Sequence, residues 1–240
     1  MKSFPYLVFK ENNSLEFSLY IVSKGSYKGA SRDVTYTSVP GRNGDLVTDN
    51  GRYNNVTIPY KMTLLNKTEF DFATLADKIK DWLSSESGYF QLWDSYDKSY
   101  FRLASYEGEV DIEQELEQLG SLSLSFNCKP FKYSFEGQKV NTISSHTSLY
   151  NAEHYPSKPY FKIYGSGTIT LNVNNESYVF NDVDGYIEVD SEMMNAYKET
   201  QPLNHKMVGA KFPEFVPGTN LISLSGNVEK IDVIPRWCRR

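Results

Sequence analysis

Two turns stand close together in Val39-Pro40-Gly41-Arg42-Asn43-Gly44-Asp45-Leu46. Pro40-Gly41 and Asn43-Gly44 each favour a turn, because proline presets φ and glycine reaches positive φ without steric cost. Shortly afterwards comes Asn50-Gly51, a preferred dipeptide of two-residue hairpin turns. The sequence therefore predicts a rigid corner followed by a projecting hairpin over residues 46–53. Such a corner is a binding site, a subunit contact or a solvated loop.

The composition favours a mainly β protein. A chain of 240 residues can bury a core as one large β domain or as two of about half that size. Aromatic residues make up 15% of the chain, which favours strands that each bury a large apolar surface. The net charge of −5 argues against electrostatic binding to nucleic acid or to a membrane surface. Cys128 and Cys238 show neither a disulfide framework nor zinc spacing, so we expect reduced thiols.

Neither a secretion signal nor a membrane span is expected. The N-terminus lacks a sustained apolar region, and no run of about 18 apolar residues occurs. We therefore expect a soluble protein that is made in the cytoplasm of a host cell.

The first half predicts a sheet with one helix across it. Period-two alternation of apolar residues indicates strands over residues 15–21, 56–64 and 122–128. Pro59 cannot donate a hydrogen bond to a neighbouring strand, so it places the second of these strands at an edge or a bulge. Cys128 falls in line with the core residues of the third strand and is expected to be a small buried hydrophobe.

The period changes to that of a helix after Asn66. With Asn66 or Thr68 as N-cap, an amphipathic helix of about four turns is expected to end at Gly88. Its apolar stripe comprises Phe72, Leu75, Ala76, Ile79, Trp82 and Leu83. A helix between strands lies across one face of a sheet in an α+β domain, and its stripe packs on the core.

The most biased segment of the chain carries acidic residues at every second position, namely Glu107, Glu109, Asp111, Glu113, Glu115 and Glu117. As a strand, this segment would carry all six carboxylates on one face. Helix propensity opposes a strand from residue 113 to residue 119, so both states stay open there. A solvated edge that resists aggregation is one interpretation. Paired catalytic carboxylates would need unequal environments, which a uniform acidic face does not offer.

The second half predicts a β-sandwich of short strands separated by turns. The expected strands are residues 160–164, 169–173, 178–180, 186–190, 221–224 and 228–234. The turns between them include Gly165-Ser166-Gly167, Asn174-Asn175, Asp184-Gly185 and Gly226-Asn227. Three arginines, Arg236, Arg239 and Arg240, follow the last strand as a solvated tail or as a basic anchor for an acidic neighbour.

A boundary after residue 133 divides the chain into domains 1–133 and 134–240, because the polar run that follows is typical of a crossing segment.

No catalytic, cofactor or metal site is predicted. The histidines His146, His154 and His205 have no metal-ligand spacing and no nucleophile beside them, and no nucleotide-binding fingerprint occurs. Carboxylates brought together from distant strands, as in glycosidases, are the enzymatic alternative. The residues themselves indicate a non-enzymatic β protein in two parts.

A carbohydrate-binding adhesin, or receptor-binding β-sandwich protein, is the alternative from another class. Its candidates for stacking on sugars are Tyr160, Tyr164, Tyr178 and Tyr186.

The order of motifs along the chain resembles the distal tail proteins (Dit) of long non-contractile-tailed phages that infect Gram-positive bacteria. In the first half, the resemblance rests on the corner quoted above, on Ile79-Lys80-Asp81-Trp82-Leu83 and on Leu122-Ser123-Leu124-Ser125-Phe126-Asn127-Cys128-Lys129-Pro130-Phe131-Lys132-Tyr133. In the second half, it rests on Asp184-Gly185-Tyr186-Ile187-Glu188-Val189-Asp190, Phe212-Pro213, Pro217-Gly218-Thr219-Asn220 and Ile234-Pro235-Arg236-Trp237.

The resemblance implies an N-terminal domain that forms a hexameric ring and a galectin-like C-terminal β-sandwich. The ring would join the tail tube protein to the tail-associated tip protein and to a receptor-binding protein at the tip of the virion tail. DNA would pass through its channel without specific binding, and the protein would need no cofactor and no membrane.

The resemblance also gives two segments a role. We expect the corner to contact the adjacent subunit, with the candidate interface residues Arg42, Asn43, Gly44, Asp45 and Leu46. Arg42 or Asp45 would fix the contact through a charged hydrogen bond. The acidic face from Glu107 to Glu117 would line the channel, where like-charge repulsion keeps DNA from adhering.

Overall fold

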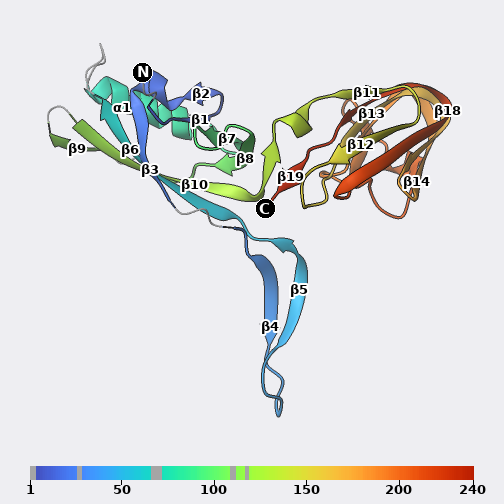
Figure 1. The fold of residues 1–240 in the computed structure, drawn as a ribbon, viewed down its shortest axis with the longest axis horizontal. Helices are drawn as coiled ribbons and strands as arrows, with labels where there is room; N and C mark the ends of the chain where they lie inside the picture. The colour runs from blue at the N-terminus through green and yellow to red at the C-terminus, as the bar shows by residue number, and fades with distance from the viewer. Residues whose placement is uncertain (1–3, 26–28, 66–71, 109–111, 117–118) are drawn as a thin grey trace. The chain divides into compact units, whose positions relative to one another are not determined.

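The computed structural model describes residues 4–25, 29–65, 72–108, 112–116 and 119–240. The chain divides into two compact units, Met1–Lys132 with Arg240, and Tyr133–Arg239. Antiparallel strands dominate both units and an α-helix lies in the first, so the mainly β fold predicted from the sequence is confirmed. Figure 1 shows the course of the chain.

The first unit consists of strands with one 3-10 turn and an α-helix among its described residues. In chain order they are β1 (Leu7–Phe9), β2 (Asn12–Asn13), η1 (Ser14–Phe17), β3 (Leu19–Lys24), β4 (Arg32–Thr37), β5 (Leu46–Tyr53), β6 (Val56–Leu65), α1 (Phe72–Ser84), β7 (Phe90–Asp94), β8 (Tyr100–Ser105), β9 (Ile112–Leu116) and β10 (Leu119–Ser134). Its main sheet runs in the order β2-β1-β7-β8-β10-β6-β3, and β9 pairs with β10. Strands β4 and β5 form a separate two-stranded sheet.

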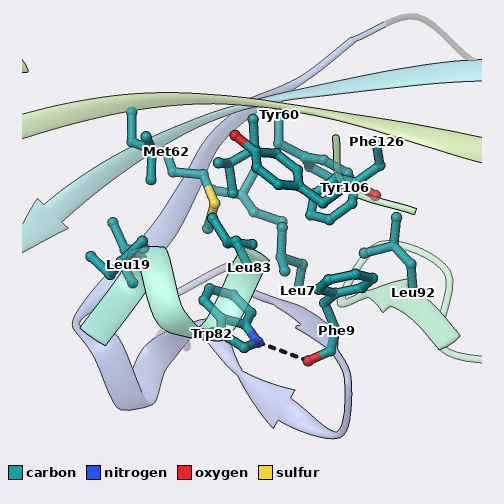
Figure 2. Packing of buried hydrophobic residues seen from close by; sticks show 14 of the residues in the cluster. Leu7, Phe9, Leu19, Tyr60, Met62, Trp82, Leu83, Leu92, Tyr106 and Phe126 are labelled. Atoms are coloured by element: carbon teal, nitrogen blue, oxygen red, sulfur yellow. Dashed lines mark hydrogen bonds between the residues drawn. The ribbon is translucent and has the colours of Figure 1, made fainter. Parts of the chain in front are cut away.

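Helix α1 packs its predicted stripe on the core of the first unit. Leu75, Ile79, Trp82 and Leu83 are buried among the apolar residues of the sheet, as predicted. The Trp82 indole Nε1 donates a hydrogen bond to the Phe9 carbonyl oxygen at 2.8 Å, which Figure 2 shows beneath the sheet. The candidate N-caps Asn66 and Thr68 lie outside the described residues.

The strand predicted over residues 15–21 is wrong in its first half, where the chain forms the 3-10 turn η1. The Asn13 side chain accepts a hydrogen bond from the Leu15 amide, and the Glu16 carboxylate accepts one from the Asn13 amide. This reciprocal capping satisfies backbone donors that a strand would leave to its neighbour, so it outweighs the apolar alternation. Strand β3 begins only after Ser18, which adopts a positive φ of 56°.

The expectation for Pro59 needs a correction, because β6 lies inside the sheet between β10 and β3. The last registered pair between β3 and β6 is Lys24 with Tyr60, so Pro59 falls just beyond the end of β3. The Pro59 carbonyl oxygen accepts a hydrogen bond from the Gly25 amide at 3.0 Å. The missing N–H therefore costs the sheet no ladder bond.

The turn between β1 and β2 is strained. Lys10 and Glu11 form this turn with φ values of 50° and 66°, a left-handed conformation that side chains other than glycine adopt at a cost.

Replacing Glu11 with glycine is expected to raise the free energy of unfolding of the first unit by about 1 kcal/mol, because glycine adopts positive φ without strain. Urea denaturation of the purified variant measures this change. Glu16→Gly, which removes the capping carboxylate instead, is the matched control and is expected to destabilise the unit. A destabilised Glu11→Gly variant would show that the turn is not strained.

The second unit is built on three long strands. Its elements are η2 (Glu136–Gln138), β11 (Asn141–Ile143), β12 (Thr147–Asn151), β13 (Tyr160–Val173), β14 (Glu176–Asp190), β15 (Asn195–Lys198), β16 (Gln201–Pro202), η3 (Asn204–Lys206), β17 (Met207–Val208), β18 (Gly218–Ile234) and β19 (Cys238–Arg239). The sheet runs in the order β11-β18-β13-β14-β15-β16, with β12 on β18 and β17 on β14.

Several predicted turns of the second half lie inside these strands instead. Gly165 pairs with Gly185 on β14, and Ile169 pairs with Gly226 on β18, where the register between β13 and β18 shifts. Gly185 and Gly226 adopt positive φ values of 76° and 98°. Gly226 lies at a register shift, whereas Gly185 lies in regular register inside β14. Neither glycine ends its strand, so pairs of predicted short strands are each one long strand. Asn174-Asn175 does form the turn between β13 and β14, as predicted.

Two of the three arginines after the last long strand, Arg236 and Arg239, bind within the second unit and are no solvated tail. Arg240 groups with the first unit, where its guanidinium lies 5.4 Å from the Tyr53 ring centroid. The Arg236 guanidinium holds both carboxylate oxygens of Asp190, at 2.7 and 2.8 Å. Arg239 bonds to Glu153 at 3.0 Å. Burial would raise the pKa of Asp190, but the Arg236 bonds and the amides of Met193 and Glu192 outweigh it and hold that pKa below its usual value.

Candidate functional site

The predicted corner is the tip of a hairpin whose arms are β4 and β5. Thr37 pairs with Leu46, so residues 38–45 connect the two strands. The Arg42 amide donates a hydrogen bond to the Val39 carbonyl oxygen at 3.1 Å, and Gly41 has a φ of 79°. Proline and glycine at the centre of this bond make a type II turn. Gly44, with a φ of 83°, marks the second turn, so both predicted turns are present.

The hairpin itself lies elsewhere than predicted. Asn50-Gly51 does not join two strands but sits inside β5, where three residues face only Asp33 on β4. Gly51 lies in this bulge and adopts a positive φ of 73°. The Asn50 amide group donates to Asp33 and to Thr35 at 3.1 Å each, which fixes the bulge across the two strands. The prediction failed because a turn-forming dipeptide also suits a bulge.

Ion pairs hold the arms of the hairpin near the bulge. Arg52 bonds to Asp33 at 2.5 Å, and Arg32 pairs with Asp49. Hydrogen bonds from Arg52 and then from Asn50 hold the pKa of Asp33 below its usual value. These groups are exposed, so their contribution to stability is small, but together they fix the register of the two strands.

A buried carboxylate anchors the strands on either side of the hairpin. Asp94 accepts a bond from Lys24, the last residue of β3, at 2.5 Å. It accepts another from the Tyr60 hydroxyl on β6 at 2.7 Å. Burial, and then the Asp94 charge, raise the pKa of Tyr60. Because Lys24 precedes the hairpin and Tyr60 follows it, Asp94 ties both of its ends to the main sheet.

The hairpin exposes apolar side chains along most of its length. Figure 1 shows β4 and β5 extending away from the main sheet of their unit. Tyr36 is 65% exposed, Val47 54%, Leu46 46% and Val39 38%. Tyr36 lies directly opposite Val47, so these two share one face of the ribbon. Sequence reasoning missed Tyr36, although Val34 and Tyr36 alternate with threonines there in the period of a strand.

Two opposite charges remain at the tip. Arg42 and Asp45 are exposed, and neither forms an ion pair with any residue in the described part of the chain. The five candidate interface residues thus lie together on or beside the tip. An isolated two-stranded ribbon is only marginally stable in water, so exposed apolar side chains on it are typical of a contact surface.

Replacing Gly44 with valine is expected to weaken self-association, because valine at a φ of 83° strains the tip by about 1–2 kcal/mol. No atom lies within 4 Å of the position that a Cβ would occupy, so the strain is purely that of the backbone. Sedimentation velocity measures the effect. Gly29→Val is the matched control, because it too has open space but no positive φ. Unchanged association of Gly44→Val would show that the tip conformation has no role in it.

The acidic segment is described only in part. Residues 112–116 form strand β9, so the strand interpretation is confirmed for that stretch. Glu113 and Glu115 lie on β9, but their side chains are outside the description, as are Glu109, Asp111 and Glu117 altogether. Glu107 is exposed and accepts a hydrogen bond from the Ser105 hydroxyl at 3.0 Å.

The four tyrosines that were candidates for sugar stacking have different surroundings in the structure. Tyr178 is 2% exposed and belongs to the core of the second unit, so it is unsuited to bind a ligand. Tyr160 bonds through its hydroxyl to Glu188 at 2.7 Å. Lysine ammonium groups lie over the other two rings: Lys162 is 4.2 Å from the Tyr186 centroid, and Lys230 is 4.6 Å from the Tyr164 centroid. These cation–π contacts occupy ring faces that a sugar would need.

Reactive and metal-binding groups are scarce in the described ranges. Burial raises the pKa of the Cys128 thiol to about 12, and likewise that of Cys238, so both thiols are poor nucleophiles. Cys128 is fully buried, as predicted. Within residues that the structure describes, no three His, Cys, Asp or Glu side chains are grouped to hold a metal ion. No described helix is long and apolar enough to cross a membrane.

Comparison with known proteins shows which family and which solved structures this chain is similar to. Residues 12–128 match the family described as phage tail protein RIFT-related domain. The Dit protein (gp 19.1) of phage SPP1, a paradigm of the hub adsorption apparatus in Gram-positive infecting phages, aligns with a TM-score of 0.70. The alignment has 12% identity and covers 96% of this chain and 98% of that chain. No curated protein sequence matches this chain.

A chain of the phage P2 baseplate in its activated conformation with Ca aligns with a TM-score of 0.51 and 10% identity, over 100% of this chain and 99% of that chain. At these identities the alignments establish the fold. The resemblance inferred from the sequence is confirmed, since residues 12–128 match the phage tail protein RIFT-related domain family and 96% of the chain shares the fold of the SPP1 distal tail protein.

Proposed function

We propose that this protein is a non-enzymatic structural component of a phage tail tip. Its first unit forms a hexameric ring that joins the tail tube protein to the tip proteins and surrounds the channel for DNA. Its second unit is a galectin-like β-sandwich that faces outward, and the assembled protein resides in the virion. The tail-associated tip protein and a receptor-binding protein are the expected partners on the side away from the tube.

The observation that carries the proposal is the agreement of two independent likenesses. The phage tail family covers residues 12–128, and the Dit fold extends over 96% of the chain. The exposed β4–β5 hairpin gives this assignment a physical basis within the chain. Its apolar side chains and unpaired tip charges suit a contact between subunits. A monomer would leave these side chains exposed to solvent.

Size-exclusion chromatography with light scattering tests the ring. We expect a mass of six chains, or of twelve if two rings stack back to back, and a six-fold ring in negative-stain electron microscopy. A strict monomer at all concentrations up to about 100 µM would refute the proposal, since obligate rings bury large interfaces. Retention of glycan binding by such a monomer would support the adhesin instead, although the covered rings of Tyr164 and Tyr186 do not favour it.

We also propose that the acidic segment from Glu107 to Glu117 faces the channel. Like charges repel the phosphates of passing DNA, whereas cationic side chains would bind them. A structure of the ring tests this proposal. Carboxylates on the outer rim would refute it without affecting the ring itself.

A further inference from the structure

The first unit carries a groove that is separate from the hairpin of the same chain. It is about 510 Å³ in volume and is lined by the β1–β2 turn, the end of α1 and the first residues of β7. Its floor includes Trp82, Phe90 and Leu103, and its rim carries Lys10, Glu11 and Glu86. No residue of β4, β5 or the tip contributes to this lining.

The charges of the groove complement those of the hairpin tip. Glu11 and Glu86 are exposed and form no ion pair within the described residues, so the rim carries two unpaired carboxylates. Lys10 donates to the Glu86 carbonyl oxygen at 3.1 Å and lies 4.7 Å from the Phe90 ring centroid. The rim therefore offers anions to Arg42 and a cation to Asp45.

Backbone strain independently marks the same rim. Lys10 and Glu11 both adopt positive φ, where glycine or asparagine would be less costly. Strained residues of this kind cluster at binding and switch regions, where the surrounding structure holds them in place. Both strained side chains belong to the groove.

We propose that the groove receives the hairpin tip of a second copy of this chain, with Arg42 against Glu86 and Glu11, and Val39 and Leu46 against the apolar floor. This inference rests on the proposed ring. The hairpin and the groove are different surfaces of one chain, so each copy donates a tip to one neighbour and accepts a tip from the other. Such a head-to-tail contact closes into a ring when its rotation allows. The 8 residues of β5 span about 27 Å, enough to cross onto a neighbour.

The test uses charge reversal on each surface of the full-length protein. Arg42→Glu places an anion against the acidic rim, and Glu86→Lys places a cation against Arg42. Each variant by itself is expected to associate about 10- to 100-fold more weakly than wild type, because like charges meet at the contact. Lys158→Glu and Glu229→Lys make the same charge changes at exposed positions of the second unit and are expected to assemble normally.

Mixing the two defective variants gives the decisive result. In an equimolar mixture, each tip finds a groove of opposite charge, so rings of alternating subunits should re-form, and native mass spectrometry should show three copies of each variant. The double variant Arg42→Glu with Glu86→Lys should also assemble by itself.

Two outcomes would overturn the groove assignment while leaving the ring intact. One is a wild-type hexamer that tolerates Arg42→Glu or Glu86→Lys without loss. The other is a mixture that stays dissociated although both variants retain their folds by circular dichroism. A wild-type protein that is itself a monomer would refute the ring.

Discussion

Arg236→Ala is expected to lower the free energy of unfolding of the second unit by about 3 kcal/mol. Asp190 is 4% exposed and loses both of its bonds to the guanidinium in this variant. A buried carboxylate without a partner is far more costly than the pair it came from. This value is at the lower end of the usual cost of removing one partner from a buried ion pair, because the Arg236 side chain is itself partly exposed. Urea denaturation, with hydrogen exchange of peptides from β14 and β18, measures the change.

Arg236→Ala combined with Asp190→Asn is the control. The side-chain amide oxygen that this second substitution introduces can still accept from the backbone amides of Glu192 and Met193, but no charge remains buried. We expect the double variant to regain more than half of the lost stability. A double variant less stable than the single one would show that the cost comes from lost packing of the Arg236 side chain.

The pH dependence of this pair has a defined sign. In the folded protein the pKa of Asp190 lies below its ordinary value of 3.8. Its contribution to stability is therefore complete above about pH 4 and is lost as the pH falls through the lower, folded pKa. In Arg236→Ala, burial dominates and raises that pKa, so the deficit relative to wild type should begin to shrink as the pH falls through the raised pKa of the variant, and should go on shrinking down to the lowered pKa of the wild type. A deficit that stays constant between about pH 3 and pH 7 would contradict the ion-pair explanation.

Tyr36→Ser with Val47→Ser is expected to dissociate the proposed ring. Both side chains are exposed on one face of the hairpin, so their loss should leave the fold of the monomer intact. Burying each at an interface contributes about 1.5–3 kcal/mol, so the double variant should associate about 100-fold more weakly or worse. Sedimentation velocity over a range of concentrations measures this loss.

The matched control for the hairpin variant lies on the second unit. Tyr150 and Leu221 are 69% and 60% exposed on paired strands, so Tyr150→Ser with Leu221→Ser removes a similar apolar area elsewhere. This control should assemble as wild type does. A hairpin variant that self-associates as strongly as wild type would show that the hairpin contributes nothing to the proposed ring.

Local chemistry in the sequence predicted much of the architecture. The apolar stripe of α1 and the alternation of Leu122, Leu124 and Phe126 identified core faces correctly, because periodicity directly reflects which side is buried. The two turns of the hairpin tip were also predicted correctly, because Pro40-Gly41 and Gly44 restrict the backbone locally.

Features that depend on pairing partners could not be predicted in the same way. Gly51 and Gly226 favour a turn or a bulge equally, and only the neighbouring strand decides between them. The corner was predicted to precede the hairpin, whereas it is the tip, because the strand β4 before it was not recognised. The groove gathers residues from several separate segments of the chain, and no spacing in the sequence brings those together.

The two open edges of the β4–β5 ribbon also bear on how the protein behaves before it assembles. An unpaired strand edge can accept any passing β-strand, so a newly made copy is exposed to aggregation until the hairpin is covered. Charged pairs and a bulge near its base are features that discourage such pairing. The apolar outer half has less of this protection, so the yield of soluble protein should depend on how quickly copies find one another after synthesis.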